Sequence, residues 1–136
     1  MIRKLSHSTL FVLDQQKAYD VYVHKFGFRV NTDFKMDDGT RWLTLNPPGQ
    51  PDLEIILAEA KSPMVDADLI PHLKALLERN AMGGGVWETD DCQATFNDLK
   101  AKGVTFTKEP TKEFYGTEAL FHDGCGNWFS LTQHEA

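Results

Sequence analysis

The feature that most restricts the fold of this chain is an internal repeat with a spacing of 76 residues. A capping aspartate, a helix alanine and a helix-ending glycine each occur twice at this spacing. The matching pairs are Asp14 with Asp90, Ala18 with Ala94, and Gly27 with Gly103. We therefore expect two similar supersecondary units within one domain of 136 residues.

The first unit has the pattern strand, helix and three strands. A β-branched apolar run predicts the first strand, and apolar residues at helical spacing predict a helix between Asp14 and Gly27. The DDGT sequence predicts a hairpin turn between two of the later strands. The expected strands cover 8–14, 28–36, 41–46 and 52–59.

The second unit repeats this order after a connecting segment. Leucines at helical spacing predict a connecting helix over about 66–80. A second helix is expected between Asp90 or Asp91 and Gly103. Strands are expected over 85–90, 104–110, 117–123 and 128–133. The sequence thus predicts an α+β fold of two tandem βαβββ modules, with module one over about 1–60, a connector over about 61–82 and module two over about 83–136.

Composition narrows the classes of partner. The net charge of -6 argues against nucleic acid and against anionic membranes, because both are bound by basic surfaces. The sequence contains no apolar run of about 20 residues and no signal peptide. Cys92 and Cys125 form neither a C-x-x-C motif nor a disulfide pattern. We therefore expect a cytoplasmic protein with free thiols.

Several segments resemble the vicinal oxygen chelate superfamily, which includes glyoxalases, bleomycin-resistance proteins and extradiol dioxygenases. The similar segments are LSHSTLFVLD, DLEIIL, LKAKGV and FHDGCGNWFSLTQ, and the resemblance covers nearly the whole chain apart from the connector. The DGCGN sequence is the most specific, although Gly124 stands where the family usually has proline. The resemblance implies sheets that form an open, U-shaped barrel, and it implies a homodimer.

The resemblance also indicates where metal ligands would lie. In metal-dependent members each module supplies ligands from its first and last strands, and these positions correspond here to His7 and Glu54. An imidazole and a carboxylate suit Ni, Zn, Mn, Fe or Co. At the 76-residue spacing the second module offers Gly83 and Ser130, so only a partial metal site is expected. His122, near the last hairpin, is a further possible donor. His7 and Glu54 also have a simpler interpretation as polar residues in the wall of a cavity.

Aromatic residues suggest a second kind of site. Strand alternation predicts that Trp42, Trp87 and Trp128 point away from the helices, with Thr44 and Ser130 on the same faces. Tyr115, in the loop before a strand, and His122 are further candidate ligand-binding residues. Aromatic walls with few polar groups are typical of small-molecule sites, although tryptophans also serve as core residues.

Two functions follow. The first is a small-molecule-binding protein with an incomplete metal site and no tightly held cofactor. The alternative is a divalent-metal-dependent lyase, isomerase or dioxygenase-like enzyme that uses His7 and Glu54, with Glu54 as the catalytic carboxylate. The glycines of MGGGVWE allow either a linker, favoured for Gly83 and Gly84, or an open edge of a cavity at Gly85.

Overall fold

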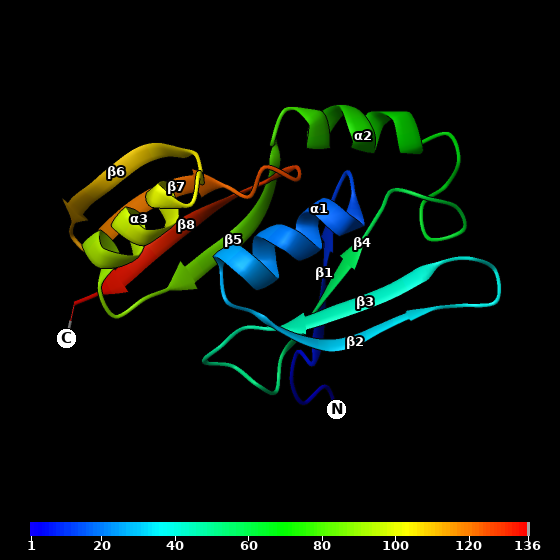
Figure 1. Ribbon diagram of the computed structural model, residues 1–136, viewed down its shortest axis with the longest axis horizontal. Helices are drawn as coiled ribbons and strands as arrows, with labels where there is room; N and C mark the ends of the chain where they lie inside the picture. Colours follow the sequence, from blue (N-terminus) through cyan, green and yellow to red (C-terminus); the bar gives the residue numbers. More distant parts are fainter. Residues whose placement is uncertain (136) are drawn as a thin grey trace. The chain divides into compact units, whose positions relative to one another are not determined.

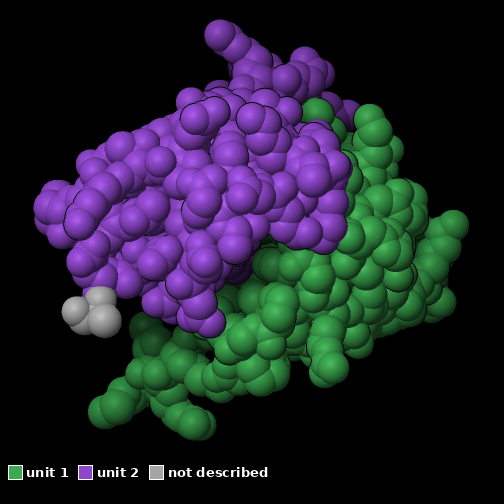
Figure 2. All heavy atoms as spheres, turned by 60° about the vertical axis from the view of Figure 1, so that its left-hand side comes forward, with its two compact units in different colours: residues 1–71 green, residues 72–136 purple. Residues whose placement is uncertain are grey.

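The computed structural model describes residues 1–135 and contains two compact units, one over residues 1–71 and one beginning at residue 72 (Figures 1 and 2). Each unit has its own four-stranded sheet, with the orders β1-β4-β3-β2 and β5-β8-β7-β6. In each sheet the first and last strands of the unit are parallel and the other neighbours are antiparallel. The predicted α+β class with two tandem βαβββ modules and open sheets is confirmed.

The first unit places a helical segment against one face of its sheet. The strands are β1 (His7–Phe11), β2 (Arg29–Lys35), β3 (Arg41–Asn46) and β4 (Glu54–Ala58), and the helical segment comprises α1 (Gln15–Tyr19) and the π-helical turn η1 (Asp20–Lys25). Asp14 caps α1 by accepting hydrogen bonds from the backbone N–H groups of Gln16 and Lys17, as predicted. Gly27 follows the helical segment with a φ of +76°.

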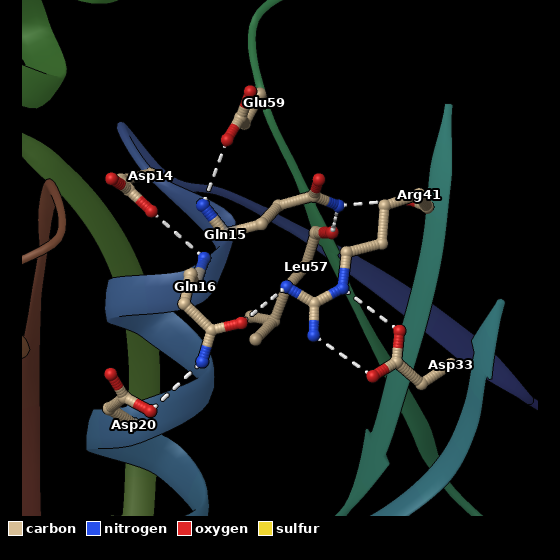
Figure 3. A network of polar contacts seen from close by, with 8 residues as sticks. All are labelled: Asp14, Gln15, Gln16, Asp20, Asp33, Arg41, Leu57 and Glu59. Atoms are coloured by element: carbon tan, nitrogen blue, oxygen red, sulfur yellow. Dashed lines mark hydrogen bonds and ion pairs between the residues drawn. The ribbon is translucent and has the colours of Figure 1, made fainter. Parts of the chain in front are cut away.

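A polar network fixes α1 to this sheet (Figure 3). The side-chain amide nitrogen of Gln15 donates to the backbone carbonyls of Arg41 and Leu57, which lie on neighbouring strands. The Arg41 guanidinium donates to both carboxylate oxygens of Asp33 at 2.9 Å and to Gln16. Its hydrogen bond, together with its charge, lowers the pKa of Asp33 despite some burial. Arg41 is therefore a structural residue on the helix side of the sheet.

The second unit has the same plan. The boundary between the units falls within the connecting helix α2 (Ile70–Glu78). The elements that follow are β5 (Met82–Glu88), α3 (Cys92–Ala101), β6 (Phe106–Glu113), β7 (Gly116–His122) and β8 (Asn127–His134). Asp91 caps α3, and Gly103 follows the helix with a φ of +88°. Both helix boundaries of the repeat are therefore confirmed, whereas the connecting helix is shorter than the predicted 66–80.

The core of the second unit is a row of aromatic rings between α3 and its sheet. Phe96 of α3 contacts Phe106 with ring centroids 4.6 Å apart, and Phe106 contacts Phe121 at 5.5 Å. Phe129, which is fully buried, contacts both Phe121 and Trp87 at 5.5 Å. The rings therefore define the helix side of this sheet and leave its other side for polar residues.

The three glycines are part of strand β5, so the linker interpretation of Gly83 and Gly84 is wrong. The pairing of β5 with β8 is irregular between Gly83 and Gly85, as in a β-bulge. Gly85 has a φ of +112°, a conformation that other residues rarely adopt. A Cβ atom on Gly84 would lie 1.9 Å from the ring of Phe129. Glycine is needed here because an aromatic core ring rests on the strand backbone.

Candidate functional site

The first sheet carries a histidine and a glutamate on the side away from α1. His7 and Glu54 are direct neighbours on the parallel strands β1 and β4, and His7 Nε2 lies 2.6 Å from Glu54 Oε2. The core leucines Leu43 and Leu45 are fully buried on the opposite side. Strand alternation predicted this separation of faces, and the structure places both residues accordingly.

Further hydrogen bonds hold this pair. Thr44 of β3 donates to Glu54 Oε1 at 2.8 Å, so both oxygens of the carboxylate have a partner. Ser6 Oγ lies 2.9 Å from His7 Nδ1. Nε2 can donate to Glu54, and the Ser6 hydroxyl can serve Nδ1 either as a donor to the neutral ring or as an acceptor from the imidazolium. Trp42 lies two residues before Thr44 in β3 and therefore shares its face.

The second sheet has a different polar centre, built around Glu118 of β7. Glu118 Oε1 accepts from Tyr115 Oη at 2.7 Å and from Lys108 Nζ at 2.9 Å. Glu118 Oε2 accepts from Ser130 Oγ at 2.6 Å. Lys108 also donates to Glu113 at 2.8 Å, so its ammonium group lies between two carboxylates. Strands β6, β7 and β8 and the β6–β7 turn all contribute to this cluster.

This arrangement keeps Glu118 ionised. Burial alone would raise the pKa of Glu118, but the hydrogen bonds from Ser130, Tyr115 and Lys108 and the charge of Lys108 outweigh it and lower the pKa to about 2. Hydrogen bonds to Glu113 and Glu118 raise the pKa of Lys108. The hydrogen bond to Glu118 likewise raises the pKa of Tyr115. The cluster is therefore a fixed ion pair network with a protonated phenol.

The pairing of β5 with β8 shows which residue of the second unit corresponds to His7, and this residue is not the predicted Gly83. Ser130 pairs with Val86, whereas Gly83 pairs with Trp128. The residue beside Ser130 is therefore Val86 and not Gly83, and the bulge in β5 accounts for one residue of this three-residue difference. Val86 is exposed and its side chain has no donor atom. The second sheet thus offers valine and serine where the first offers histidine and glutamate.

The same bulge makes the face predicted for Trp87 wrong. Trp87 pairs with Leu131 and contacts the buried ring of Phe129, so it lies on the helix side. Val86 takes the other face and is 61% exposed. The extra residue in β5 reverses the alternation that the sequence suggested.

Trp128 and His122 do lie on the same side of the second sheet as Ser130. They are direct partners in the pairing of β7 with β8, two positions from the Leu120–Ser130 pair. Trp128 is 44% exposed, and its indole passes over Gly83. Tyr115 reaches the polar centre through its hydroxyl. Among the candidate aromatic residues, Trp128 and Tyr115 are thus brought to one polar face.

Both sheets contain a hydrogen bond between a carboxylate and a hydroxyl group, but the two groups lie on opposite members of the strand pair. A shift of 76 residues places Ile56 on Thr132 and Glu54 on Ser130. Thr44 pairs with Ile56, and Glu118 pairs with Thr132, so Thr44 corresponds to Glu118. Each sheet therefore holds a carboxylate–hydroxyl hydrogen bond at equivalent positions, with the carboxylate on the last strand in the first unit and on the preceding strand in the second.

Glu118 and Lys108 are the residues that the sequence interpretation missed. A signal was present, because Glu118 alternates with the core residues Ala119 and Phe121 in TEALFH and must therefore point away from the core. The repeat did not reveal the role of Glu118, because the corresponding residue of the first unit is Thr44, which is 74 and not 76 residues away.

Metal-binding chemistry is limited in the described part of the chain. Residues 1–135 contain no group of three or more His, Cys, Asp or Glu side chains arranged to hold an ion. His7 and Glu54 supply two suitable donors, but both oxygens of Glu54 already have partners. No helix within residues 1–135 is long and apolar enough to cross a membrane.

The fold and the sequence together place the chain in a known class of proteins. Residues 4–131 match the Glyoxalase/Bleomycin resistance protein/Dioxygenase superfamily, and the chain belongs to this superfamily. It is 34% identical to the uncharacterised protein YurT of Bacillus subtilis (strain 168), over 96% of this chain and 98% of that protein.

Two solved structures extend this comparison. UcmS2 is 40% identical with a TM-score of 0.91, covering 98% of this chain and 99% of that one. TnmS3, an antibiotic binding protein from Streptomyces sp. CB03234, is 28% identical with a TM-score of 0.77, covering 98% of both chains.

Proposed function

We propose that this protein binds a small organic molecule and does so without a complete metal site. The observation that carries the proposal is the state of the two central carboxylates. Glu54 is held by His7 and Thr44, and Glu118 by Lys108, Tyr115 and Ser130. Groups of the chain thus already satisfy both carboxylates, so neither needs an ion.

The similarity to TnmS3 supports a binding function, because that protein is described as binding an antibiotic. The exposed indole of Trp128 supplies apolar contact area beside polar groups, as small-molecule sites require. The thiols of Cys92 and Cys125 are buried and form no disulfide, which agrees with the cytoplasmic location that we propose.

Metal titration tests this proposal. We expect the purified protein to retain no stoichiometric ion after dialysis, and to bind Ni, Zn, Mn, Co or Fe(II) more weakly than about 1 μM, because two protein donors leave most coordination positions to water. Elemental analysis and calorimetry measure these quantities. The variant His7→Ala should abolish any weak binding. One tightly held ion per chain would contradict the proposal.

One tightly held ion per chain would favour a second candidate function, that of a metal-dependent enzyme. In a divalent-metal-dependent lyase, isomerase or dioxygenase-like enzyme, His7 and Glu54 would bind the ion and Glu54 would also move a proton. The observation in its favour is the 2.6 Å imidazole–carboxylate pair on adjacent strands. A metal would have to displace Thr44 or His7 from the carboxylate.

We also propose that the protein is a homodimer. Strand β2 and the residue after it carry three large apolar side chains, Val30, Phe34 and Met36, that are 39%, 51% and 44% exposed. Burial of such residues is the usual driving force of association. Sedimentation at micromolar concentration should give the mass of two chains, and a single 15.4 kDa species would contradict the proposal.

A further inference from the structure

We propose that two copies of this chain pair along the outer edges of their β2 strands, antiparallel and with Phe34 on the two-fold axis. This inference rests on the proposed homodimer and deepens it by naming the interface and its strand register. It is carried by the exposed edge of β2, by the direction of the backbone groups in that strand, and by the charges along it.

The outer edge of β2 is exposed. Strand β2 is last in the order β1-β4-β3-β2, so one of its edges faces no other strand of the described residues 1–135 (Figure 1). Thr32 is partly exposed, and the other residues of the strand are all exposed. An edge of this kind is a template for pairing with a strand of another chain.

The corresponding edge strand of the second unit is protected against such pairing. Strand β6 is last in its own sheet order and contains Pro110, which has no N–H group to donate. The pairing of β6 with β7 is also irregular between Phe106 and Thr111. Strand β2 contains no proline, and its pairing with β3 is regular from Thr32 to Lys35. Of these two edges, β2 is therefore the one that can receive another strand.

The backbone of β2 shows which of its residues can pair outward. Met36 donates its N–H to the Thr40 carbonyl at 2.8 Å, across the turn that joins β2 to β3. Because hydrogen-bonded and non-hydrogen-bonded pairs alternate along antiparallel strands, Phe34 also directs its N–H and C=O groups toward β3. The N–H and C=O groups of Asp33 and Lys35 therefore point away from β3. A second strand would form its hydrogen bonds with Asp33 and Lys35.

Charge then selects the register of the pairing. With Phe34 on the two-fold axis, Asp33 of each copy faces Lys35 of the other, so two pairs of opposite charge form. With Asp33 or Lys35 on the axis, identical charges would face each other, which is destabilising. With Thr32 on the axis, Lys35 would face Arg29 of the second copy. Among these registers, the one centred on Phe34 is therefore favoured.

Asp33 can accept this additional cation. Its two carboxylate oxygens each accept one hydrogen bond from Arg41 at 2.9 Å. A carboxylate has about four lone-pair sites, so Arg41 leaves room for further donors. The Asp33 side chain also keeps 33% of its surface exposed. An ammonium group of a second copy can therefore reach it.

The same register places apolar side chains at the axis. Phe34, which is 51% exposed, faces Phe34 of the second copy, and Met36, which is 44% exposed, faces Thr32. Aromatic pairs across neighbouring strands are among those that stabilise sheets. The proposed pairing thus buries the apolar surface of β2 and opposes its unlike charges at once.

A disulfide measures this register directly. The two Phe34 residues would form a non-hydrogen-bonded pair with Cα atoms about 4.5 Å apart, which a disulfide can span. Under mild oxidation, most chains of Phe34→Cys should therefore run as a covalent dimer in non-reducing electrophoresis. Met36→Cys is the matched control, because its two copies would lie about 13 Å apart along the strands and should cross-link far less. Cys92 and Cys125 are buried and should not contribute.

Lys35→Pro tests the pairing without a new thiol. Proline removes an N–H that points away from β3, so the hydrogen bonds within the chain remain and one to the second copy is lost. We expect the dissociation constant of the dimer, measured by sedimentation, to rise at least about tenfold. Lys35→Arg keeps the N–H and the charge and should leave the constant unchanged. Circular dichroism checks that both variants keep the fold.

The outcomes separate the two proposals. A dimeric wild type in which Phe34→Cys cross-links no better than Met36→Cys, or in which Lys35→Pro dimerises as tightly as Lys35→Arg, would overturn the inference and leave the homodimer standing. A monomeric wild type would overturn both.

Discussion

Replacement of Gly84 by alanine is expected to lower the free energy of unfolding by about 3 kcal/mol, a large effect for one methyl group. The new Cβ atom would lie 1.9 Å from Cε1 and 2.4 Å from Cζ of Phe129. Phe129 is fully buried and contacts Phe121 and Trp87, so its ring has no free space into which to move. Urea unfolding followed by circular dichroism measures the change.

Gly49→Ala is the matched control for this prediction. A Cβ atom at Gly49 meets nothing within 4 Å, and the residue does not have a positive φ. Alanine there should be neutral or slightly stabilising, because it reduces the freedom of the unfolded chain. Equal stability of Gly84→Ala and Gly49→Ala would show that Phe129 does not rest on the β5 backbone.

The second large effect is the contribution of Glu118 to stability against acid. Its pKa is about 2 in the folded protein against an ordinary value of 4.5, so in this range the unfolded chain binds more protons. The stabilisation, about 3 kcal/mol, is fully present above about pH 4.5 and is lost as the pH falls toward 2. Unfolding free energies measured between pH 7 and pH 3 should show this decline.

Variants identify the source of that decline. Glu118→Gln should be less stable than the wild type at pH 7, and its stability should fall less steeply below pH 4.5. Glu109→Gln, at an exposed position of β6, should keep the wild-type slope. An unchanged slope in Glu118→Gln would mean that other carboxylates cause the acid sensitivity.

The sequence predicted the helices and the order of strands because local signals determine them. Asp14 and Asp91 cap the helices through contacts only two or three residues away, and Gly27 and Gly103 end them through their own backbone conformation. Signals of this kind are complete within a few residues, so the repeat could be found without knowledge of the tertiary structure.

The faces of β5 could not be predicted, because they depend on a partner strand. The bulge lies at Gly84, where the ring of Phe129 occupies the space above the backbone, and Phe129 is 45 residues away. One extra residue exchanged the sides of Val86 and Trp87. The placement of His7 and Glu54 was predictable, since β1, β3 and β4 pair in regular register around them.

The importance of Glu118 was hidden for a related reason. Alternation placed its side chain away from the core, but only the pairing of β7 with β8 shows that Ser130 is its partner. A repeat searched at one fixed spacing compares Glu54 with Ser130 and registers a lost carboxylate. The pairing shows that the carboxylate is present on the neighbouring strand.

Lys108 provides the second sheet with a positive charge that is part of the protein chain. Its ammonium group forms ion pairs with Glu113 and Glu118 and is covalently attached to β6 through the lysine side chain, so it cannot be replaced by an ion from the medium. A chelator such as EDTA removes bound metal ions but cannot remove the Lys108 ammonium, and metal starvation of the cell leaves that charge unchanged. The contribution of Lys108 to the electrostatic character of the face is therefore set at translation and does not depend on the supply of any ion.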